Sequence, residues 1–445
     1  MRTITKPLFI FLLNLPLALF SQNINTIAGD HSQGFAGDNG QATAAELNNP
    51  TEVAVDATGN IYITDFANDR IRKINTGGII FTVAGTGKSG YTGDNGQATN
   101  AELNNPAGIA VDTKGNLYIA DASNNVVRMV NPAGVISTFA GTGAAGFSGD
   151  GTAATSAKLS NPNSVAVDGS GNVYISDAGN DRIRMVSSTG KINTVAGNGT
   201  FAYGGDGVAA TSTSINYPYS VAVDAKGNFY IADYVNNRVR IVSSTGIINT
   251  IAGNGSPGYT GDDSAATLAE INYPIAVSVD QDSGKVYITD GADNVIRYID
   301  INGKIHTCAG NKNAGYTGNG GPATSAEMNY PYGTAVDVFG NLYIADEDNN
   351  VVREVLLPVG INELTNPKSI VVYPIPCSGV INLQSTSIKG AAAINVYDMF
   401  GKEVYSSPIQ HISNTALNLN LSNGVYLMKI TTTNGIVNKR IEVIK

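Results

Sequence analysis

Hydrophobic and polar positions follow one pattern that recurs six times between about residue 50 and residue 357. In the second copy, apolar residues alternate with polar ones in four short runs: Gly108–Asp112, Asn116–Asp121, Val126–Val130 and Gly134–Ala140. The alternation and the Val, Ile and Tyr content are typical of strands, and the Asp, Gly and Asn clusters between the runs are typical of tight turns. Each copy therefore predicts a four-stranded antiparallel sheet.

The spacing of the copies predicts how these sheets are arranged. The first aspartate of each copy recurs in steps of 56, 56, 56, 56 and 57 residues, at Asp56, Asp112, Asp168, Asp224, Asp280 and Asp337. Four short strands repeated at such a period are typical of a ring of small sheets. We expect an all-β fold, a six-bladed β-propeller.

The two ends of the repeat region indicate how the ring closes. The sixth copy ends after a third strand at residues 351–357, whereas Ile24–Gly29 (Ile-Asn-Thr-Ile-Ala-Gly) matches the fourth strand Ile248–Gly253 of another copy. We expect the N-terminal strand to complete the last sheet, which would leave no open sheet edge between the ends.

The repeated motif Val-Asp-x-x-Gly-Asn-x-Tyr-Ile-x-Asp-x-x-Asn-x-x-x-Arg resembles the NHL repeat of propeller proteins. The resemblance runs from Asn23 to about Leu357, and it is specific because the motif occurs six times. It implies an NHL-like propeller over residues 22–358. Some lyases share this propeller family and depend on histidines.

Beyond a linker at 359–367 the repeat is absent, and residues 368–445 have another pattern. Its motifs are Tyr373-Pro374-Ile375-Pro376, Val396–Val404 and Leu421–Ile430. They are similar to the C-terminal sorting domain of the type IX secretion system of Bacteroidetes, although that family usually has Asn at the position of Ile375. The resemblance implies a small β-sandwich that the secretion machinery recognises and that carries the protein across the outer membrane.

The first 21 residues have the pattern of a secretory signal peptide. Arg2 and Lys6 precede an apolar run at residues 7–20, which ends before Ser21. A run of fourteen residues is too short for a membrane-spanning helix. We therefore expect a protein that passes the periplasm and is secreted or attached to the cell surface, without a transmembrane segment.

Charge and cysteine content narrow the choice of partner. The formal net charge is −9, and the repeat region alone has 18 basic and 32 acidic residues. A surface this acidic argues against a nucleic-acid partner. The two cysteines, Cys308 and Cys377, form no disulfide framework.

Residues that recur in every copy are interpreted as structural. We expect a buried arginine to pair with carboxylates in each sheet, and an aromatic residue to fix each long connection. The structural aspartates and arginines are Asp56, Asp65, Arg72, Asp112, Asp121, Arg128, Asp168, Asp177, Arg184, Asp224, Asp233, Arg240, Asp280, Asp290, Arg297, Asp337, Asp346 and Arg353. The aromatic residues are Phe35, Tyr91, Phe147, Tyr203, Tyr259 and Tyr316.

Strand direction predicts that the long connections and the turns between second and third strands share one face. In the long connections, a Gly-Asp pair recurs at Asp38, Asp94, Asp150, Asp206 and Asp262, with Asn319 in the sixth copy. Asx-turns are the preferred interpretation, and Ca²⁺ is the alternative because oxygen-rich loops can hold it. No other cofactor or metal is expected.

Catalytic motifs are sparse. The three histidines are His31, His306 and His411, and no histidine set, HExxH or nucleophile elbow can be built from them. Gly85-x-Gly87-x-x-Gly90 fits a dinucleotide fingerprint, but it recurs in other copies and lacks a βαβ unit. No catalytic residue is predicted, and an enzyme would have to use Asp and Tyr.

The copies differ most clearly in tyrosines near the repeat proline. Copies one to three have Asn49, Asn105 and Asn161 before that proline, whereas copies four to six have tyrosine. Tyrosine offers a flat apolar face with a polar tip, which suits sugar rings and peptides. Packing between duplicated blades is the alternative explanation. The candidate ligand-binding residues are Tyr217, Tyr219, Tyr234, Tyr273, Tyr330 and Tyr332.

These features favour a non-catalytic binding module for an extracellular glycan, peptide or protein. The alternative is an extracellular lyase or hydrolase that uses Asp and Tyr residues of the long-connection face. Paired carboxylates around Asp233 and Asp290 in a deep pocket would favour that alternative.

Overall fold

The computed structural model describes residues 22–356 and seven C-terminal segments, 371–373, 377–384, 392–397, 403–409, 415–422, 424–432 and 435–443. The expected signal peptide (1–21), the expected linker (359–367), Ile375 and His411 lie outside the described residues. All regular elements described are strands or three-residue 3-10 helices.

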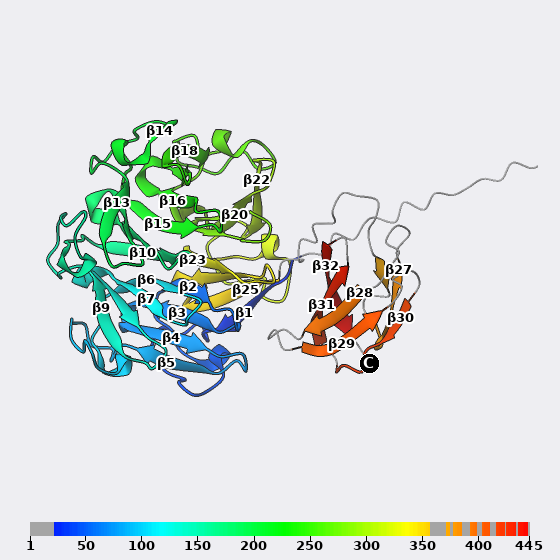
Figure 1. Ribbon diagram of the computed structural model, residues 1–445. Coiled ribbons are helices and arrows are strands. Elements are labelled where there is room, and N and C mark those ends of the chain that lie inside the picture. The colour runs from blue at the N-terminus through cyan, green and yellow to red at the C-terminus, as the bar shows by residue number, and fades with distance from the viewer. Residues whose placement is uncertain are drawn as a thin grey trace, which may run out of the picture.

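Six four-stranded antiparallel units account for residues 22–356 (Figure 1). The first three contain β2 (Pro50–Val55), β3 (Ile61–Asp65), β4 (Arg70–Ile74) and β5 (Ile80–Ala84); β6 (Pro106–Val111), β7 (Leu117–Asp121), β8 (Val126–Val130) and β9 (Ile136–Ala140); and β10 (Pro162–Val167), β11 (Val173–Asp177), β12 (Arg182–Val186) and β13 (Ile192–Ala196).

The other three units follow the same order. They contain β15 (Pro218–Val223), β16 (Phe229–Asp233), β17 (Arg238–Val242) and β18 (Ile247–Ala252), with β14 (Val208–Ala209) as a fifth strand; β19 (Pro274–Val279), β20 (Val286–Asp290), β21 (Val295–Ile299) and β22 (Ile305–Ala309); and β23 (Pro331–Val336), β24 (Leu342–Asp346), β25 (Val351–Val355) and β1 (Ile24–Ala28). The predicted strands of the second copy match β6 to β9 to within two residues at each end.

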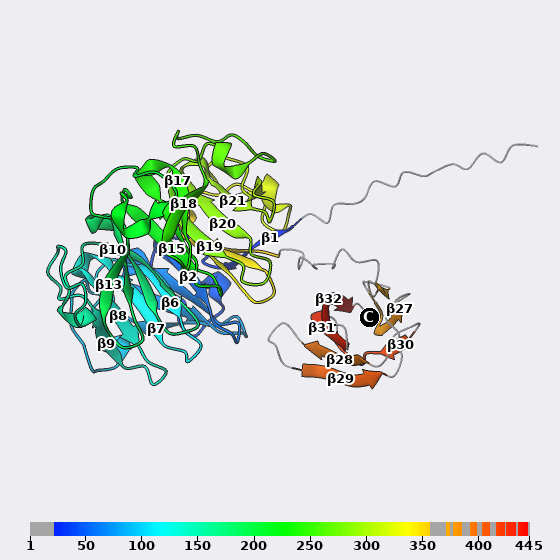
Figure 2. The same ribbon diagram turned by 45° about the horizontal axis from the view of Figure 1, so that its top comes forward.

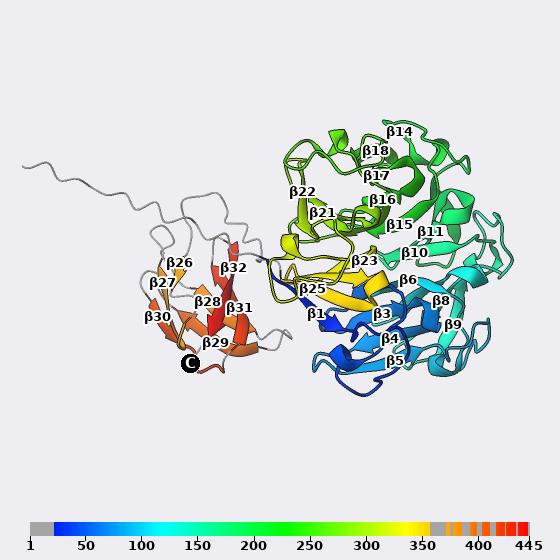
Figure 3. The same cartoon turned by 180° about the vertical axis from the view of Figure 1, so that it is seen from behind.

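The sheets form a closed ring, as the sequence predicts. Each of the first strands β2, β6, β10, β15, β19 and β23 contacts the next, and β23 contacts β2. Of these strands, β6, β10, β15 and β23 are labelled near the middle of the ring in Figure 3. β1 pairs antiparallel with β25, with Ile24 opposite Val355, so the N-terminal strand is the fourth strand of the sixth sheet. We call these sheets blades one to six, counted from β2.

Each apolar cluster of the propeller lies between neighbouring blades. The cluster between blades one and two contains Ile71 and Ala84 from one blade and Ile109 and Ile119 from the next. Burial against both neighbours explains why the second strand, such as β7, is buried at every residue. The blades therefore depend on one another and are stacked around the ring axis (Figure 2).

Two sets of 3-10 helices occupy equivalent places in the blades. One set connects second and third strands: η2 (Phe66–Asn68), η4 (Ala122–Asn124), η6 (Ala178–Asn180), η8 (Tyr234–Asn236), η10 (Gly291–Asp293) and η12 (Glu347–Asn349). The other lies in the long connections: η1 (Ala42–Ala44), η3 (Ala98–Asn100), η5 (Ala154–Ser156), η7 (Ala210–Ser212), η9 (Ala266–Leu268) and η11 (Ala323–Ser325).

The long connections do not simply gather on one face, which corrects the sequence-based expectation. Asn124 of η4 does donate to the carbonyl of Gly90 at 2.7 Å, so part of the connection lies beside this turn. However, Asn95 N donates to Ile136 O at 2.7 Å, and Ile136 N donates to Gly96 O at 3.0 Å. The connection thus also covers the outer edge of the next blade, where it satisfies backbone groups that would otherwise be open to pairing.

The C-terminal region contains two sheets. β26 (Val371–Tyr373), β27 (Val380–Gln384) and β30 (Thr415–Asn418) form one, and β28 (Ala392–Tyr397), β29 (Glu403–Ile409), β31 (Gly424–Thr432) and β32 (Gly435–Val443) form the other. Side chains of both sheets share one core, for example Ile381, Leu383, Ile394 and Met428. This is the small β-sandwich that the sequence predicts.

Cys308 and Cys377 are free and buried. Within the described residues, no helix has the length and apolar character needed to span a bilayer.

Candidate functional site

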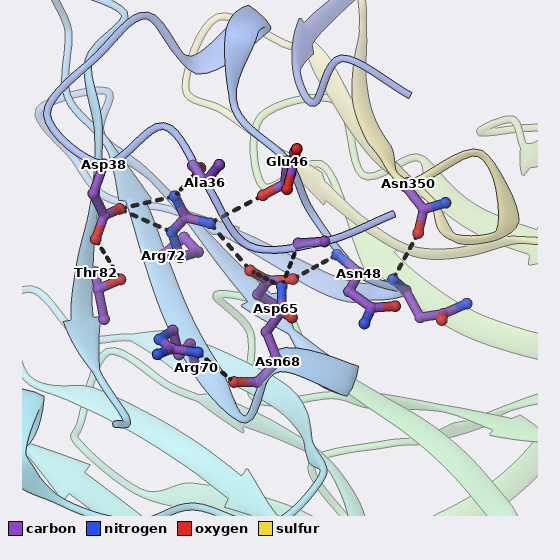
Figure 4. A network of polar contacts seen from close by, with 12 residues as sticks. Ala36, Asp38, Glu46, Asn48, Asp65, Asn68, Arg70, Arg72, Thr82 and Asn350 are labelled. Atoms are coloured by element: carbon purple, nitrogen blue, oxygen red, sulfur yellow. Dashed lines mark hydrogen bonds and ion pairs between the residues drawn. The ribbon is translucent and has the colours of Figure 1, made fainter. Parts of the chain in front are cut away.

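A buried arginine joins a strand carboxylate to a connection carboxylate in the first blade (Figure 4). Arg72 is fully buried, and its guanidinium lies 3.1 Å from Asp65 and 2.8 Å from Asp38. Burial of a charge is tolerated because both ends of the guanidinium are paired. Blades two to five repeat the arrangement with Arg128, Arg184, Arg240 and Arg297.

The strand carboxylate also fixes the turn behind it. Asp65 accepts hydrogen bonds from Asn48 N at 2.8 Å and from the Asn68 side chain at 2.9 Å, and Asn68 donates onward to Gly34 O at 2.7 Å. In every blade, a ring from the long connection lies 4.8 to 5.2 Å from the guanidinium carbon of the buried arginine. These sixfold residues therefore link the elements of each blade.

The first aspartate of each copy, such as Asp56, stabilises a turn instead of pairing with the buried arginine. Asp56 does not contact Arg72; its carboxylate accepts from Thr58 N and Asn60 N at 2.9 Å and closes its own turn. The same contacts recur around Asp112, Asp168, Asp224 and Asp337. In the fifth blade, Asp280 accepts from Asp282 N and Ser283 N.

The connection aspartates, considered above for Ca²⁺, instead hold arginine and threonine. Asp94 bonds Arg128 at 2.7 Å and accepts from the Thr138 hydroxyl at 2.7 Å. Across the described residues, no three His, Cys, Asp or Glu side chains are grouped to hold a metal ion.

The sixth blade departs from this arrangement. Asn319 replaces the connection aspartate, and its side-chain oxygen accepts from Thr26 N at 2.7 Å. Arg353 keeps Asp346 at 3.5 Å, but its terminal nitrogen Nη2, which pairs with an aspartate in the other five blades, has no partner although the side chain is fully buried.

All six tyrosines singled out from the sequence lie together, and we call them the tyrosine cluster. The rings of Tyr219 and Tyr234 are 4.8 Å apart, those of Tyr234 and Tyr273 5.0 Å, and those of Tyr219 and Tyr332 5.6 Å. Tyr217 lies 5.8 Å from Tyr219.

Two hydroxyl contacts show how far the tyrosine cluster reaches across the ring. Tyr332 O–H donates to the Tyr219 hydroxyl at 2.6 Å, although β15 and β23 are separated by β19. Tyr330 and Tyr234 are also hydrogen-bonded. The tyrosine cluster therefore spans three blades at one end of the inner strands. Tyr273 is its most open member, with 40% of its surface exposed.

Three of these tyrosines have a backbone conformation that is unfavourable for a bulky residue. Tyr217, Tyr273 and Tyr330 have φ of 48°, 53° and 52°, in the left-handed region. The blades with asparagine have the same conformation there, and asparagine tolerates it well. Each tyrosine is held by its backbone N–H, as Tyr217 N donates to Asp181 of the preceding blade at 2.8 Å. Such strain costs about 1–3 kcal/mol per residue and is concentrated at functional sites.

Two carboxyl groups near the tyrosine cluster were not predicted from the sequence. Glu347 is the first residue of η12 and occupies the repeat position of Tyr234. Its charge acts on Tyr219, Tyr330 and Tyr332. Glu52 lies on β2 against the backbone of Gly333, where a Cβ atom would collide with its carboxylate. Comparing the six copies at the first turn position would have revealed Glu347.

Burial shifts the acidities of these groups upward. Desolvation raises the pKa of Glu347 to about 7, with a smaller contribution from Asp348, and desolvation raises the pKa of Glu52 to about 8. It also raises the pKa of Tyr219 to about 12 and that of Tyr332 well above its usual value. Glu347 therefore titrates near neutral pH, whereas Tyr219 and Tyr332 keep their protons.

The carboxylates on which the enzymatic alternative relied are not accessible. Asp233 and Asp290 are fully buried in different blades. Asp233 accepts from Asn216 N at 2.8 Å and from Arg240 at 3.2 Å. Asp290 has Asp293 as a second carboxyl beside it, and the pKa of both groups is raised, mainly by burial. Neither buried group can touch a substrate.

The two described histidines have no contact residue in common. His31 stacks on Tyr316 at 4.5 Å and contacts Asn349 O at 2.9 Å. His306 lies on β22 of the fifth blade, 2.7 Å from Asp263. They form no shared site, and neither belongs to the tyrosine cluster.

Comparison with known proteins matches both parts of the chain. The teneurin NHL domain family matches residues 22–92, 87–148 and 143–204, and the NHL repeat family matches residues 216–242. The secretion system C-terminal sorting domain family matches residues 371–445. Protein SUPPRESSOR OF QUENCHING 1 of Arabidopsis thaliana is 34% identical over 329 residues, which cover 70% of this chain and 30% of that protein. The chain thus spans less than a third of this relative.

Two solved structures from Bacteroides thetaiotaomicron have a similar fold. One is a protein of unknown function, with 20% identity and a TM-score of 0.54, and the other is an auxiliary nutrient binding protein, with 14% identity and a TM-score of 0.55. In each case the alignment covers 75% of both chains.

The fold and the matched families define an exported β-propeller protein with a separate sorting domain. The chain carries an NHL-repeat propeller and a type IX secretion sorting domain, which directs it to the cell surface or the medium.

Proposed function

We propose that the propeller is a non-catalytic binding module whose extracellular ligand contacts the tyrosine cluster. The observation that carries the proposal is the left-handed backbone of Tyr217, Tyr273 and Tyr330. Three blades of the same chain fill this position with asparagine, which relieves the strain. Retaining three strained tyrosines side by side is expected where their rings have a task beyond packing.

The chemistry of the tyrosine cluster is suited to binding. Grouped tyrosines supply apolar faces for contact and hydroxyl groups for hydrogen bonds, and they lose little conformational entropy when they bind. The sorting domain supports a ligand encountered outside the cell. Extracellular glycans, peptides and proteins are the ligand classes to test.

A screen of extracellular glycans, peptides and proteins on the purified protein tests this function. The informative variant combines Tyr217→Asn, Tyr273→Asn and Tyr330→Asn, because it restores the residues of blades one to three and preserves the fold. We expect it to lose at least about tenfold in affinity for the screened ligand, equivalent to about 1.4 kcal/mol.

Phe201→Asn provides a matched control, since Phe201 is 74% exposed and lies outside the tyrosine cluster. Undiminished binding by the triple variant, with every ligand found, would refute the proposal.

An acid–base enzyme is the second candidate, favoured by the raised pKa of Glu347 and Glu52 beside the tyrosine cluster. A group that titrates near the working pH can donate and accept a proton. Turnover of a bound ligand by the wild type, together with its loss in Glu347→Gln at unchanged affinity, would favour this candidate.

A further inference from the structure

The tyrosine cluster and Glu347 form a site with aromatic and acidic groups but no basic ones. Four repeat positions per blade carry these groups: before the proline, the first two after it, and the first of the following turn. In the six blades these 24 positions (six times four) include six tyrosines, Glu52 and Glu347, and no Lys or Arg. The charged group that acts on Tyr219, Tyr330 and Tyr332 in common is Glu347.

Neither carboxyl group has a cation to pair with. Among the described residues, Glu347 and Glu52 form no ion pair, whereas the six buried arginines of the blades are each paired with an aspartate. Glu347 is half-buried at the start of η12. A partly buried carboxylate without a counter-ion is costly, and a cation that binds beside it removes that cost.

Aromatic rings complement the same kind of ligand. The face of a tyrosine ring carries negative potential, so a cation within about 6 Å of the ring is attracted to it. Neutral sugars would gain from the rings but not from the carboxylates. The charge pattern therefore distinguishes between ligand classes that the rings alone would accept.

We propose that this site binds an alkylammonium group, carried by a lysine of an extracellular peptide or protein, between the tyrosine cluster and Glu347. The proposal rests on the proposed binding function and specifies its ligand class. It also assigns Glu347 as the counter-ion of the ammonium group. The equivalent positions of the other five blades carry no charged residue.

The pH dependence follows from the groups that face Glu347. These are Asp348 on its own turn, Tyr219 on β15, and Tyr330 and Tyr332 at the start of β23. The tyrosines stay protonated at neutral pH, and burial places the pKa of Glu347 at about 7. Affinity for an ammonium group therefore increases as the pH rises from about 6 to about 8, because Glu347 becomes ionised.

The experiment titrates the purified protein with a short peptide that has blocked ends and one central lysine, by isothermal calorimetry or NMR. We expect a dissociation constant on the order of 1 mM, and at least about tenfold weaker binding when the lysine is ε-acetylated. A lysine-free peptide with a free amino terminus tests whether the ammonium source matters. Equal binding of the lysine peptide and of the lysine-free peptide with a free amino terminus would overturn the assignment to lysine.

Two variants locate the contact. Glu347→Gln should weaken lysine-peptide binding at least about tenfold, and the triple asparagine variant should do the same. Asp282→Asn removes one charge from an exposed turn between β19 and β20 and should leave binding unchanged. Wild-type binding by Glu347→Gln or by the triple variant would overturn the proposal, since the attraction would then be non-specific.

The outcome also separates this inference from the proposed function. A neutral glycan that binds in a tyrosine-dependent manner, with no effect of Glu347→Gln, would sustain the binding function and overturn the ammonium site. If no ligand bound by the wild type depended on the tyrosine cluster, both the binding function and the ammonium site would be overturned.

Discussion

At the residue scale, single departures from the repeat stand out because five other blades show what the position normally does. Asp206 of blade four pairs with Arg240 at 2.9 Å and accepts from Thr250 N at 2.8 Å. Asn319 of blade six keeps only the backbone contact, to Thr26. The difference is one carboxylate, and it leaves part of a buried guanidinium unsatisfied.

Asn319→Asp is therefore expected to stabilise the protein. The new carboxylate would pair with Arg353 and still accept from Thr26 N, as Asp206 does in its own blade. Satisfying a buried charged donor is worth about 1–3 kcal/mol. The free energy of unfolding from urea titration measures the gain.

The reverse substitution in blade five, Asp262→Asn, should destabilise by a similar amount, because Arg297 would lose its 2.7 Å partner. Equal stability of wild type and Asn319→Asp would show that Arg353 is already satisfied.

Asp293 is the second departure. In blade two the equivalent Asn124 donates to Asp121 at 2.9 Å, but an ionised Asp293 has nothing to donate to Asp290. Burial and the neighbouring charge raise the pKa of Asp290. A carboxyl with a raised folded pKa binds its proton more tightly in the folded state, so its contribution to stability falls as the pH rises from about 4 through the folded pKa.

Asp293→Asn should flatten that pH dependence and stabilise the protein by about 1 kcal/mol at pH 7, the value of a restored hydrogen bond. Unfolding free energies at pH 5 and pH 8 test the sign. Asp282→Asn removes an equal charge at an exposed position and should leave the slope unchanged. The expectation would be contradicted if the free energy of unfolding of the wild type rose between pH 5 and pH 8 and that of Asp293→Asn rose by the same amount.

At the element scale, the pattern of strands was predictable and the course of the connections was not. Alternation fixes which residues face the neighbouring blades, and the match between residues 24–29 and 248–253 locates the closing strand. The hydrogen bonds between Asn95–Gly96 and Ile136 join a polar connection to the next blade, and no periodicity reports them. Comparison of the copies reveals the tyrosines, and at the first turn position it would also have revealed Glu347, but only the fold places the Glu347 carboxyl group beside the tyrosines.

The closing strand gives a prediction of its own. Ile24 on β1 and Ile136 on β9 occupy the same repeat position, and both are fully buried. Ile24→Ala should therefore destabilise as much as Ile136→Ala, by about 2–5 kcal/mol. Thermal and urea unfolding of the two variants provide the comparison. A much smaller loss for Ile24→Ala would mean that the terminal strand contributes little to the ring.

At the scale of the whole molecule, the two parts have separate cores and separate tasks. The propeller core lies between blades, and the residues of the C-terminal core all come from that region. The matched sorting family gives the second part its role in export, and the propeller presents the candidate site. The boundary between the two parts was predictable from the sequence because the repeat ends abruptly. The ligand was not predictable, because a repeat pattern reports the scaffold and not what it binds.

A chain that ends at residue 358 should fold as a propeller and fail to reach the cell surface or the medium. The reason is that the segment matched by the sorting family would be missing. Cell fractionation with an antibody against the propeller measures the distribution, and the full chain is the control. Truncated protein in the medium at the level of the full chain would contradict the expectation.

The pairing of Ile24 with Val355 has a consequence for the order of events during synthesis. The first strand to be made is among the last to find its partner, since 331 residues separate the two (355 minus 24). Until then, β1 has no partner and β25 has an open edge, which is the situation in which two copies exchange strands. The pairing of β1 with β25 closes the ring within one chain. Before closure, the same pairing can form between two chains, so we expect a strand-exchanged dimer to be the main misfolded product.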